Sequence, residues 1–238
     1  MGALDGKNVV VIGGTSGIGL AVAAAAKDAG ANVWGASRTQ EKIDAAAASL
    51  PDIRFRPLDT HDVAALDALF SEVGTVDHIV AAATGANRTT RPFIEQTEEQ
   101  FSEAFNKFWG YTRVVRTGVP HLAADGSVTL VSGIPARKCN PNMSSISCVG
   151  NAVEGLTRAL AIELAPQRVN VVAPGIIDTG MFAALGDHKQ ATFDQMSKSI
   201  PIGRVGQAGE VAAAIMLCIT NGFMTGATID VDGGALLP

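Results

Sequence analysis

A short apolar run that leads into three spaced glycines constrains this chain more than any other feature. Residues 9–12 read Val-Val-Val-Ile, a pattern typical of a strand that is buried on both faces. Gly13, Gly17 and Gly19 follow, and the alanine-rich residues 20–26 favour a helix. A strand, a glycine turn and a helix in this order can bind a dinucleotide, because the helix N-terminus offers free N–H groups to a pyrophosphate. An ordinary tight turn is the alternative interpretation.

The end of the second predicted strand, residues 31–37, indicates which dinucleotide is bound. Such a strand end usually meets the adenosine ribose, where an acidic residue would hold the ribose hydroxyls and repel a 2′-phosphate. This chain has Ser37 followed by Arg38 at that point. Because a guanidinium can bind a phosphate with two hydrogen bonds, we predict NADP(H) rather than NAD(H). A solvated arginine at a helix start, with either cofactor accepted, is the alternative.

Strand-like and helix-like segments alternate along the rest of the chain. The further strands are predicted at residues 53–58, 77–83, 127–132, 169–173 and 227–231, and the further helices at 39–50, 62–70, 97–119, 150–164 and 210–219. This alternation implies parallel strands joined by right-handed crossovers. We therefore predict one α/β domain over residues 1–238, a doubly wound, Rossmann-like parallel sheet with helices on both faces.

Three local expectations accompany this fold. A polar loop is expected to follow the predicted strand at 127–132 and to run as far as Ser147. His78 is expected at the edge of a strand. Residues 180–201 are expected to cover the substrate. In sheets of this kind ligands bind beyond the carboxyl ends of the strands, so the loops at that end are where functional residues belong.

Composition excludes several classes of protein. A formal net charge of −5 argues against general nucleic-acid binding, which needs a basic face. No apolar run reaches the roughly 18 residues that span a membrane, and residues 1–7 do not form an apolar leader. The three cysteines lack a disulfide framework spacing, and His78 lacks partners at metal-ligand spacing. We expect a cytoplasmic protein with no metal, membrane or nucleic-acid partner.

Several motifs together resemble the short-chain dehydrogenase/reductase family, and the resemblance covers nearly the whole chain. Residues 13–19 look like the glycine signature of the family, and Asp59 lies where the family places an acid beside the adenine. Residues 153–165 are similar to the helix that follows its active site, and residues 168–179 to its nicotinamide-side motif. Two further segments, 203–206 and 225–234, also match.

The resemblance implies a set of cofactor-binding positions in the glycine turn and after several strands. They are Gly13, Thr15, Ser16, Gly17, Ile18, Gly19, Ser37, Arg38, Asp59, Thr60, Ala81, Pro174, Gly175, Ile177 and Thr179. It also implies a small-molecule substrate and a homodimer or homotetramer, paired through the predicted helices at 97–119 and 150–164 and through the C-terminal strand.

The catalytic residues of the family do not carry over to this chain. The family has a Tyr four residues before a Lys, and these positions fall on Ile146 and Gly150; its Ser falls on Gly133, beside Ser132. In the family the Tyr exchanges a proton with the substrate oxygen, and the Lys lowers the pKa of that Tyr. Isoleucine and glycine can do neither. The chain has one tyrosine, Tyr111, on a different predicted helix.

A lysine on the helix at 97–119 is a candidate replacement. Lys107 falls where the family has a helical Asn, although Asn106 is one step away. We hypothesise that its stem extends into the volume that Gly150 leaves, and that it places a positive charge near the nicotinamide ribose or the substrate oxygen. Tyr111 lies one turn further along and is expected to assist. The alternatives are that Lys107 faces solvent or a subunit contact and that Tyr111 packs between helices.

Other polar residues fall near the same predicted pocket. Ser132 is the third catalytic candidate, because it ends the fifth predicted strand. Four cations lie on loops at this end of the sheet, and they indicate either a site for an anionic substrate or solvated loop charge. They are Arg88, Arg91, Arg137 and Lys138.

These observations favour one function and leave two others open. The favoured function is an NADP(H)-dependent oxidoreductase that acts on a carbonyl/alcohol pair with a non-standard acid/base arrangement. The alternatives are a non-redox enzyme on the same scaffold, such as a cyclase, isomerase or lyase, and a catalytically silent nucleotide-binding subunit. The fold cannot choose between them. The intact glycine turn, Arg38 and residues 174–179 favour retained cofactor binding.

Overall fold

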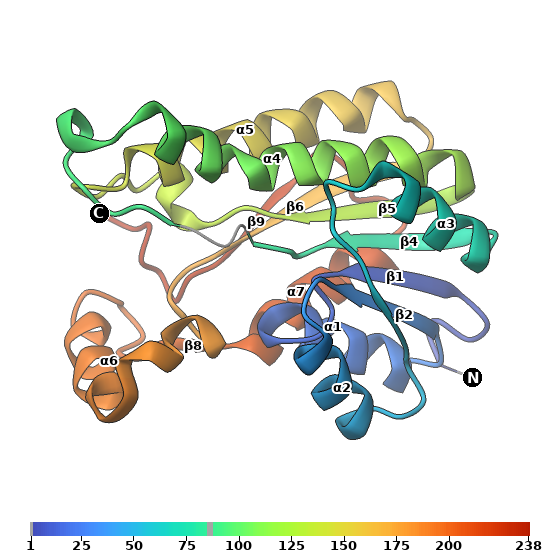
Figure 1. The fold of residues 1–238 in the computed structure, drawn as a ribbon, viewed down its shortest axis with the longest axis horizontal. Coiled ribbons are helices and arrows are strands. Elements are labelled where there is room, and N and C mark those ends of the chain that lie inside the picture. Colours follow the sequence, from blue (N-terminus) through green and yellow to red (C-terminus); the bar gives the residue numbers. More distant parts are fainter. Residues whose placement is uncertain (1, 85–87) are drawn as a thin grey trace.

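A seven-stranded parallel sheet organises the computed structural model, which describes residues 2–84 and 88–238 (Figure 1). The strand order is β3-β2-β1-β4-β5-β6-β9. The strands are β1 (Asn8–Ile12), β2 (Asn32–Ser37), β3 (Arg54–Pro57), β4 (Val76–Ala81), β5 (Leu122–Val131), β6 (Arg168–Pro174) and β9 (Thr228–Val231). A separate parallel pair joins β7 (Ile177–Asp178) to β8 (Gly206–Gln207). This topology confirms the predicted doubly wound, Rossmann-like fold.

Helices cover both faces of the sheet (Figure 1). One face carries α3 (Val63–Val73), α4 (Glu98–Gly118) and α5 (Ser144–Glu163), and the other carries α1 (Gly17–Asp28), α2 (Gln40–Ser49) and α7 (Ala208–Thr220). Short 3-10 helices are η1 (Phe93–Glu95), η2 (Val119–His121), η3 (Ile134–Ala136) and η4 (Gly180–His188), and α6 (Lys189–Ser197) follows η4. None of the helices in the described ranges has the length and apolar character needed to cross a membrane.

The apolar run of β1 is buried on both sides of the sheet. Val9 and Val11 belong to the hydrophobic cluster under α1 and α7, whereas Val10 and Ile12 belong to the cluster under α3, α4 and α5. This division follows from the alternation of side chains along a strand. The same strand therefore anchors both layers and holds the glycine turn at the centre of the sheet.

The start of α5 differs from the prediction. The helix begins at Ser144, so the loop that was expected to reach Ser147 ends earlier. Residues 144–148 have modest helix propensity, yet Ser145, Ser147 and Val149 are buried by the surrounding structure. Tertiary packing therefore extends the helix beyond its local signal. The N-terminus of α4 follows the prediction, because Thr97 forms a capping box with Gln100.

His78 lies inside the sheet, so its expected place at a strand edge was wrong. It is 7% exposed, on β4 between β1 and β5. Its Nδ1 is 2.9 Å from the hydroxyl oxygen of Ser127. Because burial disfavours the imidazolium, the pKa of His78 is lowered to about 4.

We expect His78 to make the stability of the fold depend on pH. In the unfolded chain the imidazole takes up a proton near its ordinary pKa of 6.5, whereas the folded protein resists protonation until about 4. The stabilisation is complete above the unfolded pKa and is lost as pH falls through this window, by about 2 kcal/mol near pH 5. Urea unfolding of the wild type and of His78→Gln should show a flatter pH dependence for the variant. Equal pH dependence in both proteins would contradict the expectation.

Candidate functional site

A cavity of about 730 Å³ lies at the carboxyl ends of the strands. Its walls come from the glycine turn after β1, the residues that follow β2, β3 and β4, one face of α4, and the start of η4. This is the position that the order of strands and helices predicts for a ligand.

Two glycines of the turn, Gly13 and Gly19, have no room for a side chain. Gly13 has a φ of +87°, and a Cβ there would lie 2.6 Å from the backbone nitrogen of Ala83. A Cβ on Gly19 would collide with the carbonyl oxygen of Gly13. The N-cap residue of α1, Ser16, makes no side-chain capping hydrogen bond. The N-terminus of α1 therefore borders the cavity without a side-chain cap, which suits the binding of an anionic group.

Residues from two segments line the end of the cavity near β2 and β3. Ser37 ends β2, Arg38 and Thr39 follow it, and Thr60 and His61 follow β3. Arg38 is exposed at this end, where its guanidinium can meet a phosphate.

Asp59 does not belong to this wall of the cavity. It is exposed and is not among the described residues that line the cavity. Its carboxylate accepts a hydrogen bond from the backbone N–H of His61, at 2.9 Å. Asp59 therefore shapes the turn that places Thr60 and His61 in the wall.

Lys107 lies at the other end of the cavity. Its Nζ donates a hydrogen bond to the backbone oxygen of Ser132, at 3.2 Å, and lies 5.5 Å from the centre of the Tyr111 ring. Burial, and to a lesser extent the like charge of Arg88, lowers the pKa of Lys107 to about 7. The arrangement places an amine that can exchange a proton near neutral pH on the cavity wall.

The space beside Gly150 is filled, so the expected route of the Lys107 stem was wrong. A Cβ on Gly150 would lie 2.8 Å from the Cβ of Ala136, because η3 packs against α5 at this point. Lys107 is directed to the carbonyl of Ser132 instead. The space that a side chain at position 150 would need is therefore occupied by η3 and not by Lys107.

Tyr111 lines the cavity with its ring and is otherwise buried, at 1% exposure. Its hydroxyl donates to the backbone oxygen of Val131, at 3.3 Å. Burial raises the pKa of Tyr111, so the phenol stays protonated. The single tyrosine of the chain therefore contributes a wall and a hydrogen bond to β5.

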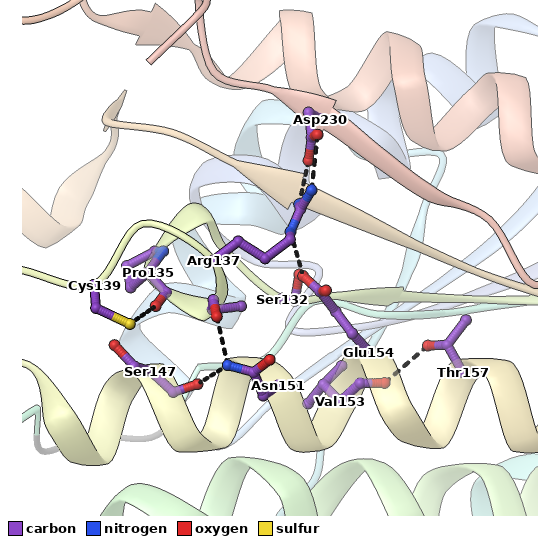
Figure 2. Close-up of polar contacts among 11 residues, drawn as sticks. Ser132, Pro135, Arg137, Cys139, Ser147, Asn151, Val153, Glu154, Thr157 and Asp230 are labelled. Atoms are coloured by element: carbon purple, nitrogen blue, oxygen red, sulfur yellow. Dashed lines mark hydrogen bonds and ion pairs between the residues drawn. The ribbon is translucent and has the colours of Figure 1, made fainter. Parts of the chain in front are cut away.

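The hydroxyl of Ser132 points to a buried carboxylate, as Figure 2 shows. Ser132 Oγ donates to Glu154 Oε1 at 3.1 Å, and the same oxygen is 3.4 Å from Nε of Arg137. The guanidinium of Arg137 also binds both carboxylate oxygens of Asp230 (Figure 2). Ser132 itself is not among the described residues that line the cavity.

The loop cations separate into two groups. Arg137 is held in the ion pairs just described, and Lys138 donates to the backbone oxygen of Ala235. Arg88 is the one loop cation of the four that lines the cavity, within the described part of the chain. Its Nη1 lies 3.1 Å from Sδ of Met181, at the start of η4.

The remaining sequence-predicted positions fall in and around the same cavity. Thr15, Ile18 and Thr179 line it with the glycine turn. Ala81 is fully buried in β4, and its successors Ala82, Ala83 and Thr84 line the wall instead. Pro174, Gly175 and Ile177 lie outside the described lining, at the end of β6 and in β7.

Sequence reasoning missed residues of two kinds. Those after β4 and on α4 have a local signal, since they end or follow a predicted strand or lie one turn from Lys107; they include Ala82, Ala83, Thr84 and Glu103. Glu154 had no such signal, because a carboxylate in the middle of an amphipathic helix is normally solvent-facing.

In residues 2–84 and 88–238 no group of three or more His, Cys, Asp or Glu side chains is arranged to hold a metal ion. All three cysteines are free thiols, and Cys218 is buried.

Comparison with known protein families matches residues 13–235 to the family described as Enoyl-(Acyl carrier protein) reductase. The chain is 34% identical to the short-chain dehydrogenase/reductase ucsE of Acremonium sp, over 98% of this chain and 97% of that one. It is 31% identical to L-xylulose reductase of Mesocricetus auratus, over 98% of each chain.

Solved structures with similar sequences share the fold. The MalC reductase/Diels-Alderase of Malbranchea aurantiaca has a TM-score of 0.90 and 31% identity, with 99% of this chain and 98% of that one covered. A small-chain dehydrogenase in complex with NADPH has a TM-score of 0.85 and 32% identity, with 98% and 100% covered.

Proposed function

Because the chain belongs to the short-chain dehydrogenase/reductase family, we propose that it is an NADP(H)-dependent oxidoreductase acting on a carbonyl/alcohol pair. One observation carries the proposal. A single cavity contains the N-terminus of α1, the guanidinium of Arg38 and the amine of Lys107. These groups match the pyrophosphate, the 2′-phosphate and the proton transfer that the reaction requires.

The residues around the cavity fit the cofactor. Gly13 and Gly19 have no room for a Cβ, so the backbone of the turn can come close to a pyrophosphate with its N–H groups. Ser37 and Arg38 would hold the 2′-phosphate, and Thr60 with His61 would border the adenine. The wall after β4, together with Thr179, would hold the nicotinamide end. The bound cofactor supplies the hydride, and the relative in complex with NADPH supports this assignment.

Lys107 is the residue that we assign to proton transfer. In reduction, hydride adds to the carbonyl carbon, and the Lys107 ammonium gives its proton to the oxygen, so the neutral amine must later regain a proton from water. A pKa of about 7 suits a group that gives and regains a proton near neutral pH. The charge of Arg88 favours the release of the proton.

The acid/base arrangement is then non-standard for the family. The positions that match the family's Tyr and Lys carry Ile146 and Gly150, both on α5. Neither residue has a side chain that transfers protons. We assigned these two positions by counting back along the chain from residues 151–153, where the family-like helix begins. The hydride transfer would be the same as in the family, whereas the proton would come from Lys107 on α4 and not from a tyrosine on α5.

The test of the function is a measurement of NADPH consumption with a panel of aldehydes and ketones. We expect one molecule of alcohol to form for each NADPH oxidised. Product formation without any change in nicotinamide absorbance would instead identify a cyclase, isomerase or lyase. NADPH binding with no product from any class of substrate would identify a silent nucleotide-binding subunit.

Arg38 should decide the preference for NADPH. We expect Arg38→Gln to weaken NADPH binding by about 10- to 100-fold, because charge-assisted hydrogen bonds to the 2′-phosphate are worth about 1.5–3 kcal/mol. NADH, which lacks this phosphate, should bind the variant as it binds the wild type. Calorimetric titration with both cofactors measures the two affinities. Arg91→Gln is a matched control, because Arg91 is an exposed loop cation outside the described cavity lining. An equal loss for both cofactors would contradict the assignment.

We also propose a homodimer or homotetramer with a small-molecule substrate. The exposed faces of α4 and α5 carry large apolar side chains, including Trp109 at 51% and Ile162 at 81% exposure. A partner subunit would remove them from water. Segment 180–201 folds mainly as η4 and α6, and its first residues, Gly180 and Met181, form the proposed substrate side of the cavity.

A further inference from the structure

We propose that Glu154 is a positioning residue for the reaction, which fixes Ser132 so that its backbone carbonyl holds the Lys107 amine on the cavity wall. The proposal rests on the proposed function, in which Lys107 is the proton donor. Glu154 touches neither the cavity nor the reacting atoms, so it would act through Ser132 alone.

Glu154 is a buried carboxylate whose contacts explain why it is tolerated. It is 4% exposed, in the middle of α5. A buried carboxylate strongly destabilises a fold unless it is paired and hydrogen-bonded. Oε1 of Glu154 has two such partners, the hydroxyl of Ser132 at 3.1 Å and Nε of Arg137 at 3.4 Å. The carboxylate therefore joins the first residue after β5 to the loop that follows η3.

Arg137 ties this contact to a third element. Its guanidinium bridges Glu154 on α5 and Asp230 on β9 (Figure 2). Asn151, one turn before Glu154 on α5, donates to the backbone oxygen of Ala136 (Figure 2). The segment from Ser132 to Arg137 is thus fastened to α5 at several points.

The hydroxyl and the backbone carbonyl of Ser132 bind different partners. Its hydroxyl proton is engaged by Glu154, and its carbonyl oxygen accepts the hydrogen bond from Lys107. The sequence indicated Ser132 as a donor to the substrate, whereas the geometry turns that donor away from the cavity. Ser132 therefore serves the site through its backbone carbonyl, while Glu154 anchors its side chain and the backbone oxygen of Val172 accepts from its N–H.

The carbonyl of Ser132 opposes the other influences on Lys107. A carbonyl acceptor favours the ammonium over the amine, whereas burial and the like charge of Arg88 disfavour it. Among the described residues, Tyr111 also faces the amine, and Glu103 lines the same cavity. The backbone N–H of Ser132 donates to the backbone oxygen of Val172 at 2.9 Å, so without the Glu154 contact the Ser132 peptide would keep this bond and lose its side-chain anchor. The carbonyl on its other side would then be free to turn from the Lys107 amine. The pKa of Lys107 would then fall.

The experiment measures the pKa of Lys107 without turnover. Competitive labelling with acetic anhydride over a pH series, read by peptide mass spectrometry, reports the protonation of this one lysine. We expect Glu154→Ala to lower the Lys107 pKa by about one unit, a tenfold change in its protonation equilibrium. The alkaline limb of kcat/KM should move to lower pH by the same amount. Glu154→Gln keeps an acceptor for the Ser132 hydroxyl, so it should restore most of the shift.

Two further variants serve as controls. Glu163→Gln removes an exposed carboxylate from the same helix and should leave the Lys107 pKa unchanged. Arg88→Gln should raise the pKa, because a like charge is removed, and this shows that the labelling reads Lys107. If Glu154→Ala does not fold, Ser132→Ala tests the same contact from the other side, with the same downward shift expected.

An unchanged Lys107 pKa in Glu154→Ala would overturn the proposal. An upward shift would overturn it as well, because it would mean that Glu154 only keeps water away from the amine. The labelling result is separate from the proposed function. Full activity of a variant without Lys107 would remove the lysine from the reaction, whereas the labelling shift concerns only what holds the lysine in place.

Discussion

The Lys107→Met variant is expected to lose about 100-fold or more of kcat for carbonyl reduction while its affinity for NADPH stays within about twofold. Methionine has a similar length and fills the same space between Tyr111 and the carbonyl of Ser132. It cannot give a proton to the substrate oxygen. The fold should not suffer, because an apolar side chain replaces an amine that burial already disfavours.

Steady-state kinetics and fluorescence titration of NADPH measure the two quantities. Lys198→Met is a suitable control, because Lys198 is exposed at the end of α6. The wild-type kcat/KM should also fall as pH rises through about 7, since the donor must be protonated in the free enzyme. A Lys107→Met variant with kcat within twofold of the wild type would remove Lys107 from the mechanism.

The Gly17→Val variant should lose NADPH binding by about 100-fold or more. Gly17 starts α1 with a φ of +52°, which a β-branched residue does not adopt without strain of about 1–3 kcal/mol. A Cβ there would also lie 3.2 Å from Cγ2 of Thr179. The turn would relax, and the N–H groups of the first helical turn would leave the position from which they can bind the pyrophosphate. Each charge-assisted hydrogen bond lost in this way adds about 1.5–3 kcal/mol.

A matched variant separates this effect from a general loss of helix stability. Gly209→Val introduces the same side chain into the first turn of α7, where a Cβ has nothing within 4 Å. We expect this variant to bind NADPH as the wild type does, by calorimetric titration, with a similar melting temperature. If Gly17→Val binds NADPH as tightly as Gly209→Val, then the glycine turn does not hold the pyrophosphate.

Local patterns in the chain were enough to predict the fold and the glycine turn that borders the cavity. The run at residues 9–12 predicts a strand buried on both faces, and the spacing of Gly13, Gly17 and Gly19 predicts the turn that follows it. Each of these signals lies within a dozen neighbouring residues. Periodicity, turn chemistry and helix propensity act over this range, so they can be read without coordinates.

The end of the cavity that we propose for proton transfer depends on contacts between distant parts of the chain. Lys107 meets a carbonyl 25 residues away, Ser132 meets a carboxylate 22 residues away, and Arg137 meets Asp230 across 93 residues. Ala136 occupies the space beside Gly150, and this contact cannot be predicted from the spacing of residues in the sequence. Whether a serine presents its hydroxyl or its carbonyl to a cavity depends on which buried group competes for it. Only the packing of α4, α5 and β9 around the end of β5 decides that competition.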